Sequence, residues 1–410
     1  MNRRAESNLQ SLSMQVHLFG ALVAPVLSYC FEVWGPALLS KGGIGRSSAV
    51  TQMLTNPQHA VQFDFLRALG GRLRKSISKL VMLREFGTQP LAYQWFKSAV
   101  CFWNKVVDRQ NCDPSDWLVL AMRENAQLSV STGIAAHVRS SLWAGQFQKL
   151  LHSLPDASSF LPGGAGSTFD ISVTPWPSIH VDQASKAFHR LVFSPLLSPS
   201  DDPRMASSTE VTYSTYENWF ASAPFHELPA EHAALWTSSF HLLGGLKRSH
   251  LLALLRFRLG AHDLRVVSGK WERHNGLPRS LRLCERCSQH CVEDEYHMIF
   301  DCDAYESIRD RHRPLFDQGG TGDPGLVGGF SHVGRRMAEF MNQTDVRRLS
   351  SFIYECFLTR ALGVDPALNL LSESGGSVSS CFLSCESAGS WPASDVDDDF
   401  ISCSTDDSGF

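Results

Sequence analysis

Three observations predict a mainly α-helical protein. Apolar residues recur at helical spacing over much of the 410-residue chain, a Ser-, Pro- and Gly-rich stretch interrupts them, and a dense group of cysteines and histidines follows near residue 290. The predicted architecture is a helical block, a long linker, a small helical domain held by zinc, and a disordered acidic tail. A composition of 43% hydrophobic and 19% charged residues is typical of a soluble globular protein.

The net charge of −4 hides an uneven distribution. Residues 365–410 contain nine acids and neither Lys nor Arg, so the rest of the chain has 37 basic and 32 acidic residues, a net charge of +5. A mildly basic body permits nucleic-acid binding. Because a disordered acidic tail can fold over basic surface, we expect its removal to strengthen that binding.

The eleven cysteines do not form a disulfide scaffold. Their number is odd, two of them form a C-x-x-C pair, and no secretory signal is recognised, which indicates a reducing compartment, the nucleus or the cytoplasm. The apolar run from Leu18 to Phe31 imitates a signal peptide, but it is too short to span a bilayer and Glu32 closes it. We interpret it as a buried helix and expect no membrane partner.

The first predicted segment, residues 1–50, contains one apolar helix over residues 15–36, followed by a loop. This helix is expected to be interrupted or bent at Pro25 and to stop at Gly35-Pro36. The second segment, residues 51–153, is a block of amphipathic helices. Between two of these helices lies a basic turn that is either an ordinary solvated loop or a patch that contacts phosphate, through Arg72, Arg74, Lys75 and Lys79.

The remaining three segments follow from composition. Residues 154–235 are rich in Ser, Pro and Gly and are predicted to be a linker or a loosely ordered insertion. Residues 236–364 regain helical periodicity, carry the Cys/His group, and end with a helix from about Met337 to Leu362. Residues 365–410 are the predicted disordered tail.

The Cys/His group has the spacing of a metal site. Its predicted ligands have a C-x2-C-x9-H-x4-C spacing and are Cys284, Cys287, His297 and Cys302. Two cysteines three positions apart form a tight knuckle whose thiolates reach one ion, and three thiolates with one imidazole suit zinc. Because four protein ligands leave no position for water, we expect a structural role.

Two local features of this segment predict its backbone structure. His297 and Cys302 are five positions apart and cannot share one face of a continuous α-helix, so a turn near Asp301 is expected. After the last ligand, Asp303 and Glu306 fit a capping box for a short helix.

Alternatives remain at this site. Cys291 or His290 could replace one ligand. Free buried thiols with chance spacing are disfavoured, because all four ligands lie within 19 residues of a segment too polar to form its own core. The acids of this segment argue against direct phosphate contact by the loop, so the expected contacts are the flanking Arg279, Arg282 and Arg286. Catalytic zinc patterns of proteases and nucleobase deaminases are not found, nor is the second ligand set of a cross-brace ubiquitin-ligase module.

Three stretches together resemble a known family. They are LFGALVAPVLSYCFEVWGP, FDFLRALGGRLRKSISKLVMLREFGTQPLAYQWFKSAVCFWNKVV, and LCERC followed by VEDEYHMIFDCDAY. In this order they resemble the carboxy-terminal region of non-LTR (LINE-type) retrotransposon reverse transcriptases, over residues 15–155 and 236–362. The resemblance implies a thumb-like helical block behind the reverse-transcriptase palm, and a Cys-Cys-His-Cys zinc knuckle.

The sequence departs from this family at the residues that catalyse reverse transcription. Reverse transcription needs carboxylates that hold magnesium, one pair in a Tyr/Phe-x-Asp-Asp hairpin, and no Asp-Asp pair here has that context. We therefore expect a non-enzymatic, truncated relative with no polymerase activity and no small-molecule substrate. Its expected partner is RNA or DNA, bound weakly through the backbone. The alternative is a degenerate remnant with no selected function, or with a protein-interaction role only.

Overall fold

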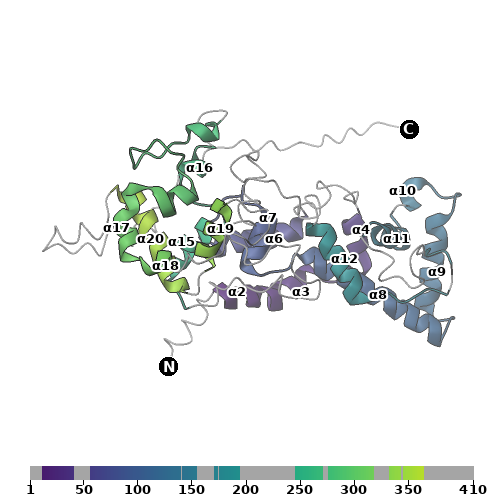
Figure 1. The fold of residues 1–410 in the computed structure, drawn as a ribbon. Helices are drawn as coiled ribbons and strands as arrows, with labels where there is room; N and C mark the ends of the chain where they lie inside the picture. Colours follow the sequence, from purple (N-terminus) through teal and green to yellow (C-terminus); the bar gives the residue numbers. More distant parts are fainter. Residues whose placement is uncertain are drawn as a thin grey trace, which may run out of the picture. The chain divides into compact units, whose positions relative to one another are not determined.

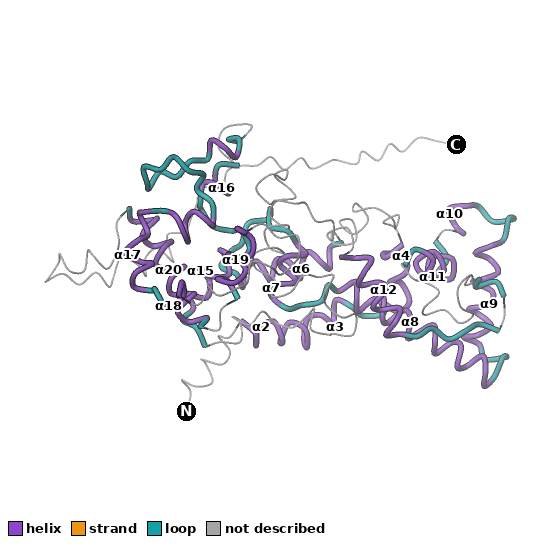
Figure 2. Tube along the Cα trace, in the orientation of Figure 1, coloured by secondary structure: helices purple, strands orange, loops and turns teal. Residues whose placement is uncertain are grey.

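All regular elements in the described part of the chain are helices (Figures 1 and 2). The structure is a computed structural model, and it describes residues 12–40, 56–139, 141–154, 170–173, 175–193, 245–270, 276–317, 332–342 and 345–363. Extended pairing within these ranges is limited to one antiparallel bridge between Leu283 and Val292. The mainly α prediction is therefore confirmed. Gly363 ends the unit to which all described residues belong, and the predicted tail lies outside them.

The N-terminal apolar segment is not one helix. It consists of α2 (Leu12–Leu18), a π-helical turn (Phe19–Val23), α3 (Ala24–Leu27) and α4 (Phe31–Ser40). Of the two outcomes predicted at Pro25, the interruption is found, as the π-helical turn that directly precedes α3, whereas the bend is not found at this residue. The chain turns instead at Ser28–Cys30, where Cys30 has a left-handed φ of 55°.

The predicted stop at Gly35-Pro36 is also wrong. Pro36 lies inside α4, where it deprives the carbonyl of Glu32 of its usual helical donor. The indole Nε1 of Trp143, from another helix, donates a hydrogen bond of 2.9 Å to that carbonyl. Because a distant side chain supplies the missing donor, the helix continues through the proline.

The segment is also less buried than the sequence suggests. Phe31 is fully buried, but Leu22, Val26 and Tyr29 expose 66%, 74% and 77% of their surface. No single helix in the described ranges is long and apolar enough to cross a membrane. One pair, Leu12–Leu27 with Phe31–Leu39, passes that test together, although an 89° bend separates the two parts.

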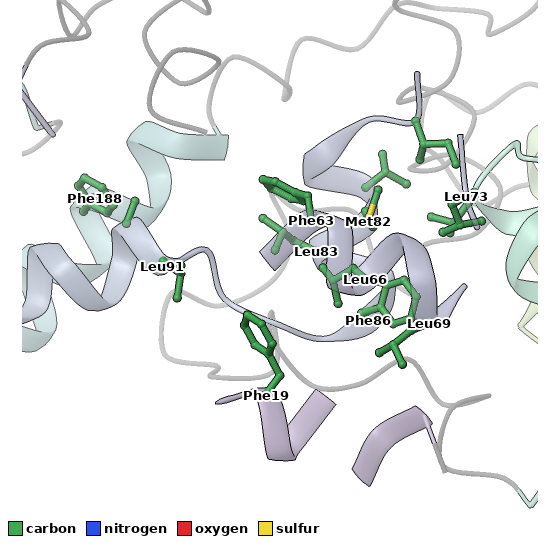
Figure 3. Close-up of a cluster of buried hydrophobic side chains, with 14 of the residues drawn as sticks. Phe19, Phe63, Leu66, Leu69, Leu73, Met82, Leu83, Phe86, Leu91 and Phe188 are labelled. Atoms are coloured by element: carbon green, nitrogen blue, oxygen red, sulfur yellow. The ribbon is translucent and has the colours of Figure 1, made fainter. Parts of the chain in front are cut away.

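The predicted helical block is present as α6 (Pro57–Leu69), α7 (Lys79–Phe86) and α8 (Leu91–Cys112). Apolar residues of α6 and α7 form a shared core with Phe19, Leu73 and Leu91 (Figure 3). Helix α8 packs against α4, and the ring of Phe31 stacks on Trp95 with centroids 3.7 Å apart. Helices α4 and α8, which belong to segments predicted as separate, are thus packed together.

The chain continues with α9 (Trp117–Val130), α10 (Ala136–Arg139), α11 (Trp143–His152) and α12 (Val181–Phe193). Helix α12 lies within residues 154–235, so the linker prediction is wrong for residues 175–193. Two α8 side chains fix the approach to it: Trp103 donates to the carbonyl of Pro177, and Asn104 bonds both backbone groups of Ile179. The rings of Phe96 and Phe188 then stack at 4.5 Å. The rest of the predicted linker lies mostly outside the described residues.

The C-terminal part contains α15 (Arg248–Arg258), α16 (Arg265–Ser268), α17 (Glu306–Arg311), α18 (Pro314–Asp317), α19 (His332–Met341) and α20 (Val346–Leu362). The helix predicted from Met337 to Leu362 is two helices, because the Asp345 side chain caps a new helix by accepting from the N–H of Arg348 at 3.0 Å. Helix α15 packs against α20. In the sequence, the segment that carries the predicted metal ligands lies between these two helices.

Candidate metal centre

The first two predicted ligands lie in a short hairpin. The N–H of Cys284 donates to the carbonyl of Cys291 (2.8 Å), and the N–H of Glu293 donates to the carbonyl of Arg282 (2.9 Å). These bonds close the loop between Leu283 and Val292. His290 adopts a left-handed φ of 53° and helps the chain to reverse. The hairpin therefore holds Cys284 and Cys287 in the tight knuckle that their spacing predicts.

The other two ligands are joined by a π-helical turn, His297–Asp301. The N–H of Cys302 donates to the carbonyl of His297 at 2.8 Å, five residues back. The wide turn closes the spacing that an α-helix could not close, and the backbone becomes extended at Cys302, with ψ of 121°. The sequence predicted a turn near Asp301, and the π-helical turn is its physical form.

The four ligand atoms converge, all within 4.8 Å of one another. Cys284 Sγ and Cys302 Sγ are 3.8 Å apart, and Cys287 Sγ and His297 Nε2 are 3.3 Å apart. Two sulfurs bound to one tetrahedral zinc at about 2.3 Å would lie about 3.8 Å apart. The four side chains could therefore hold one metal ion, and the Cys284–Cys302 distance matches that of two sulfurs on a tetrahedral zinc.

Hydrogen bonds favour negative charge on one sulfur, that of Cys284, whereas burial raises the pKa of Cys287. The hydrogen bond between the Cys284 and Cys302 sulfurs lowers the pKa of Cys284 to about 3, against the effect of burial. The same hydrogen bond raises the pKa of Cys302, and burial acts in that direction too. Backbone N–H groups point at all three sulfurs, from Arg286 to Cys284 and from the residues two positions after each of the other cysteines. Such donors stabilise thiolate, the form that binds metal.

The alternative ligands lie outside this cluster. Cys291 and His290 are exposed, and the Cys291 thiol faces the carbonyl of Gln289 at 3.5 Å. The predicted capping box after Cys302 is wrong. Asp303 accepts instead from Gln289 Nε2 (2.8 Å), so it links the knuckle to the second ligand pair, and no side chain caps the 3-10 turn Asp303–Tyr305 or α17.

Three consecutive acids beside the site are buried, although the sequence interpretation had placed this charge on a loop. Glu293, Asp294 and Glu295 expose at most 6% of their surface. Glu293 forms two hydrogen bonds to the guanidinium of Arg360 at 2.8 and 2.9 Å. Glu295 lies 3.0 Å from His262 Nε2, which lowers the pKa of Glu295 although burial acts against it.

The central acid, Asp294, acts within the site itself. One of its oxygens accepts from the N–H of His297 at 2.9 Å, at the start of the turn that carries this ligand. The other oxygen lies 3.2 Å from Arg279. Through these bonds, the three acids hold the segment that carries the ligands against α20, against His262 after the end of α15, and against the 3-10 turn Arg279–Leu281.

The cations predicted to contact phosphate differ in their exposure and in the bonds they already make within the protein. Arg72, Arg74 and Lys75 are exposed, whereas Lys79 is partly buried and lies 5.4 Å above the Phe63 ring, where burial lowers its pKa. In the second group, Arg279 pairs with Asp294 and the exposed Arg286 donates to the carbonyl of Arg360. The Arg282 guanidinium is committed to the carbonyls of Val266 and Leu277.

Sequence reasoning missed the partners of the buried acids. Arg360 lies 67 residues from Glu293, and His262 lies 33 residues from Glu295. A signal did exist: three adjacent acids between two ligand pairs are costly to bury unless cations reach them, so cations on flanking helices could have been proposed as partners.

Comparisons with known proteins leave the chain without an assigned relative. No protein-family model, no curated protein and no solved structure matches it.

Proposed function

We propose that this chain is a zinc-stabilised, non-enzymatic nucleic-acid-binding protein, derived from the carboxy-terminal region of a non-LTR retrotransposon reverse transcriptase. The observation that carries the zinc assignment is the convergence of three sulfurs and one imidazole nitrogen within 4.8 Å. This donor set suits zinc better than the oxygen-preferring divalent ions. The retrotransposon origin rests on the order of the three sequence stretches described above.

The metal's role in this proposal is structural. Four protein donors complete a tetrahedral zinc shell, so no coordination position is left for a reacting water. The buried acids of the ligand segment bond to residues of α15–α16 and α20. A metal that fixes this segment would therefore also fix the packing between those helices.

Support for nucleic-acid binding comes from charge. Residues 1–364 have a net charge of +5, and Arg72, Arg74 and Lys75 lie exposed in one loop. Such a surface supplies the sequence-independent, backbone-directed affinity that phosphate contacts give.

A second candidate function is protein interaction alone. It is favoured by the exposed apolar side chains of the N-terminal helices, where Val33 of α4 (56% exposed) adds to Leu22, Val26 and Tyr29. Exposed apolar groups of this kind are common where proteins dock.

The metal assignment is tested by native mass spectrometry after exchange into metal-free buffer. We expect the wild-type chain to retain one zinc. Cys287→Ser should lose it and expose residues 276–317 to hydrogen exchange, because metal binding and folding are coupled at such sites. Cys291→Ser is the matched control and should retain it, since its thiol faces away from the cluster. A wild-type segment that is folded without metal would contradict the assignment.

The nucleic-acid assignment is tested by titrating the metal-loaded chain with an unstructured RNA at several salt concentrations. We expect weak binding whose log–log salt dependence has a slope of roughly −0.7 per phosphate contact. An absence of binding at low salt would leave protein interaction as the better candidate. Primer extension with magnesium should give no product.

A further inference from the structure

The basic loop after α6 lies against α15. Arg256 of α15 donates a hydrogen bond of 2.7 Å to the carbonyl of Gly71, although 185 residues separate the two. Arg74 of the loop pairs with Asp263, just beyond α15, at 2.9 Å. The structure thus joins two cationic segments that are distant in the sequence.

Together these segments concentrate positive charge. Residues 65–84 contain six Lys or Arg, residues 245–262 contain four, and neither stretch contains an acid. Some of these cations have acidic partners, as Arg258 has in Glu85. Four of them are exposed and have no ion pair among the described residues: Arg72, Lys75, Lys247 and Arg248.

Helix α15 presents two of its cations on one side. Arg248, Leu252 and Arg256 follow one another at intervals of four residues, and Leu252 and Arg256 both lie beside Gly71. Arg248 is therefore on the same side of the helix, about 12 Å from Arg256 along the axis. Because stacked nucleotides rise about 3.4 Å each, these two cations span roughly three to four phosphates.

Arg72 adds an independent observation. Its φ is +60°, directly after Gly71 at +76°. A non-glycine residue in this conformation is strained, and glycine would satisfy the turn at less cost. An exposed arginine at a position where the backbone favours glycine points to a use for its charge.

We propose that Arg72, Lys75, Arg248 and Arg256 form a surface that binds the phosphodiester backbone of a single-stranded nucleic acid. We call it the loop–α15 surface. This inference rests on the proposed nucleic-acid-binding function and gives it a location. It also adds two residues of α15 to the contacts expected from the sequence.

An anionic membrane is the weaker partner for this surface. Helices that lie on a bilayer bury an apolar face beside their cations. Among the side chains that the structure describes in residues 65–84 and 245–262, no large hydrophobic one is exposed. A cationic surface without an apolar anchor suits a phosphate backbone better.

The test compares two matched double variants of the full-length, metal-loaded chain. Arg248→Gln/Arg256→Gln removes two charges from the surface, and its melting temperature reports whether loss of the hydrogen bond to Gly71 disturbs the fold. Lys97→Gln/Lys105→Gln removes two charges at the same eight-residue spacing from exposed positions of α8. Each protein is titrated with single-stranded RNA, with single-stranded DNA of the same sequence, and with phosphatidylserine vesicles.

We expect the α15 variant to lose about fivefold or more in affinity for a strand and to lower the salt slope by about 1.4, whereas the α8 variant loses less than about twofold. Arg72→Gly should weaken binding with an unchanged or higher melting temperature, because it removes charge and backbone strain together. If the wild type binds a strand and both double variants weaken it equally, the surface is misplaced while the proposed function stands. If the wild type binds neither strand, or binds vesicles only, the loop–α15 surface and the proposed nucleic-acid-binding function are both wrong.

Discussion

At the scale of single residues, His59 has a role that its neighbours explain. The N-cap residue of α8, Pro90, makes no side-chain cap. Two side chains of α6 supply acceptors instead: His59 Nε2 accepts from the N–H of Ala92 at 3.0 Å, and Gln62 Oε1 accepts from the N–H of Leu91 at 3.4 Å. The His59 ring is fully buried and meets Trp95 edge-on. It must stay neutral to accept this hydrogen bond.

This arrangement predicts a pH-dependent stability. Burial, with the nearby charge of Lys79, lowers the pKa of His59 to about 3. The unfolded chain binds that proton at a pKa of about 6.5. Below this value the unfolded state takes up the proton and the folded state does not, so the free energy of unfolding falls by up to about 1.4 kcal/mol per pH unit from this group.

The measurement is urea unfolding between about pH 7 and pH 4. We expect His59→Gln, which retains an acceptor but does not titrate, to flatten the pH dependence relative to the wild type. His180→Gln removes an exposed histidine and should leave the dependence unchanged. Equal pH dependence in the wild type and His59→Gln would show that His59 is not buried neutral.

At the scale of elements, two ion pairs connect the same parts of the chain in different environments. Glu85 of α7 and Arg258 of α15 lie 2.7 Å apart, with 0% and 3% of their side chains exposed. The Arg74–Asp263 pair is 43% and 50% exposed. Removing one partner of a buried pair leaves an uncompensated charge, whereas an exposed pair is screened by water.

Single and double substitutions should separate these cases in denaturant unfolding. We expect Arg258→Met to lower the free energy of unfolding by about 3–5 kcal/mol, and the double change Glu85→Leu/Arg258→Met to recover most of that loss. Asp263→Asn, the exposed control, should cost less than about 1 kcal/mol. A small effect of Arg258→Met would mean that α7 and α15 do not bury this pair together.

The same scale shows what helical periodicity could and could not predict. It located the helical block, because its apolar faces repeat within a few turns. It failed where the end of a helix depends on a side chain far away in the sequence. Helix α4 continues through Pro36 because Trp143, 111 residues from Glu32, supplies a hydrogen-bond donor. Helix α12 was missed because the residues leading into it are held by Trp103 and Asn104 of α8, while its own neighbourhood is rich in Ser and Pro.

At the scale of the whole molecule, the separation in sequence between interacting residues explains how much of the site could be predicted. The four candidate ligands lie within 19 residues, so their spacing alone placed them together. The buried acids' partners and the contact between Arg256 and Gly71 depend on tertiary packing across 33 to 185 residues. No local pattern contains that information.

The last prediction concerns the acidic tail, and it follows from charge alone. Residues 365–410 carry nine acids and no Lys or Arg, so removing them changes the net charge from −4 to +5. A polyanionic nucleic acid is repelled by the full chain's net charge and attracted by that of the shortened chain. We expect a chain that ends at Val364 to bind single-stranded RNA more tightly than the full chain at low salt.

The difference should shrink as salt rises, because exposed charges farther apart than about 10 Å are screened at 0.1 M ionic strength. The measurement is an RNA titration of both chains over a range of salt concentrations. A full-length chain with the nine acids replaced by Asn or Gln is the matched control, since it retains the tail's length without its charge. If only the shortened chain binds more tightly, the tail acts by occupying space, and the electrostatic argument fails.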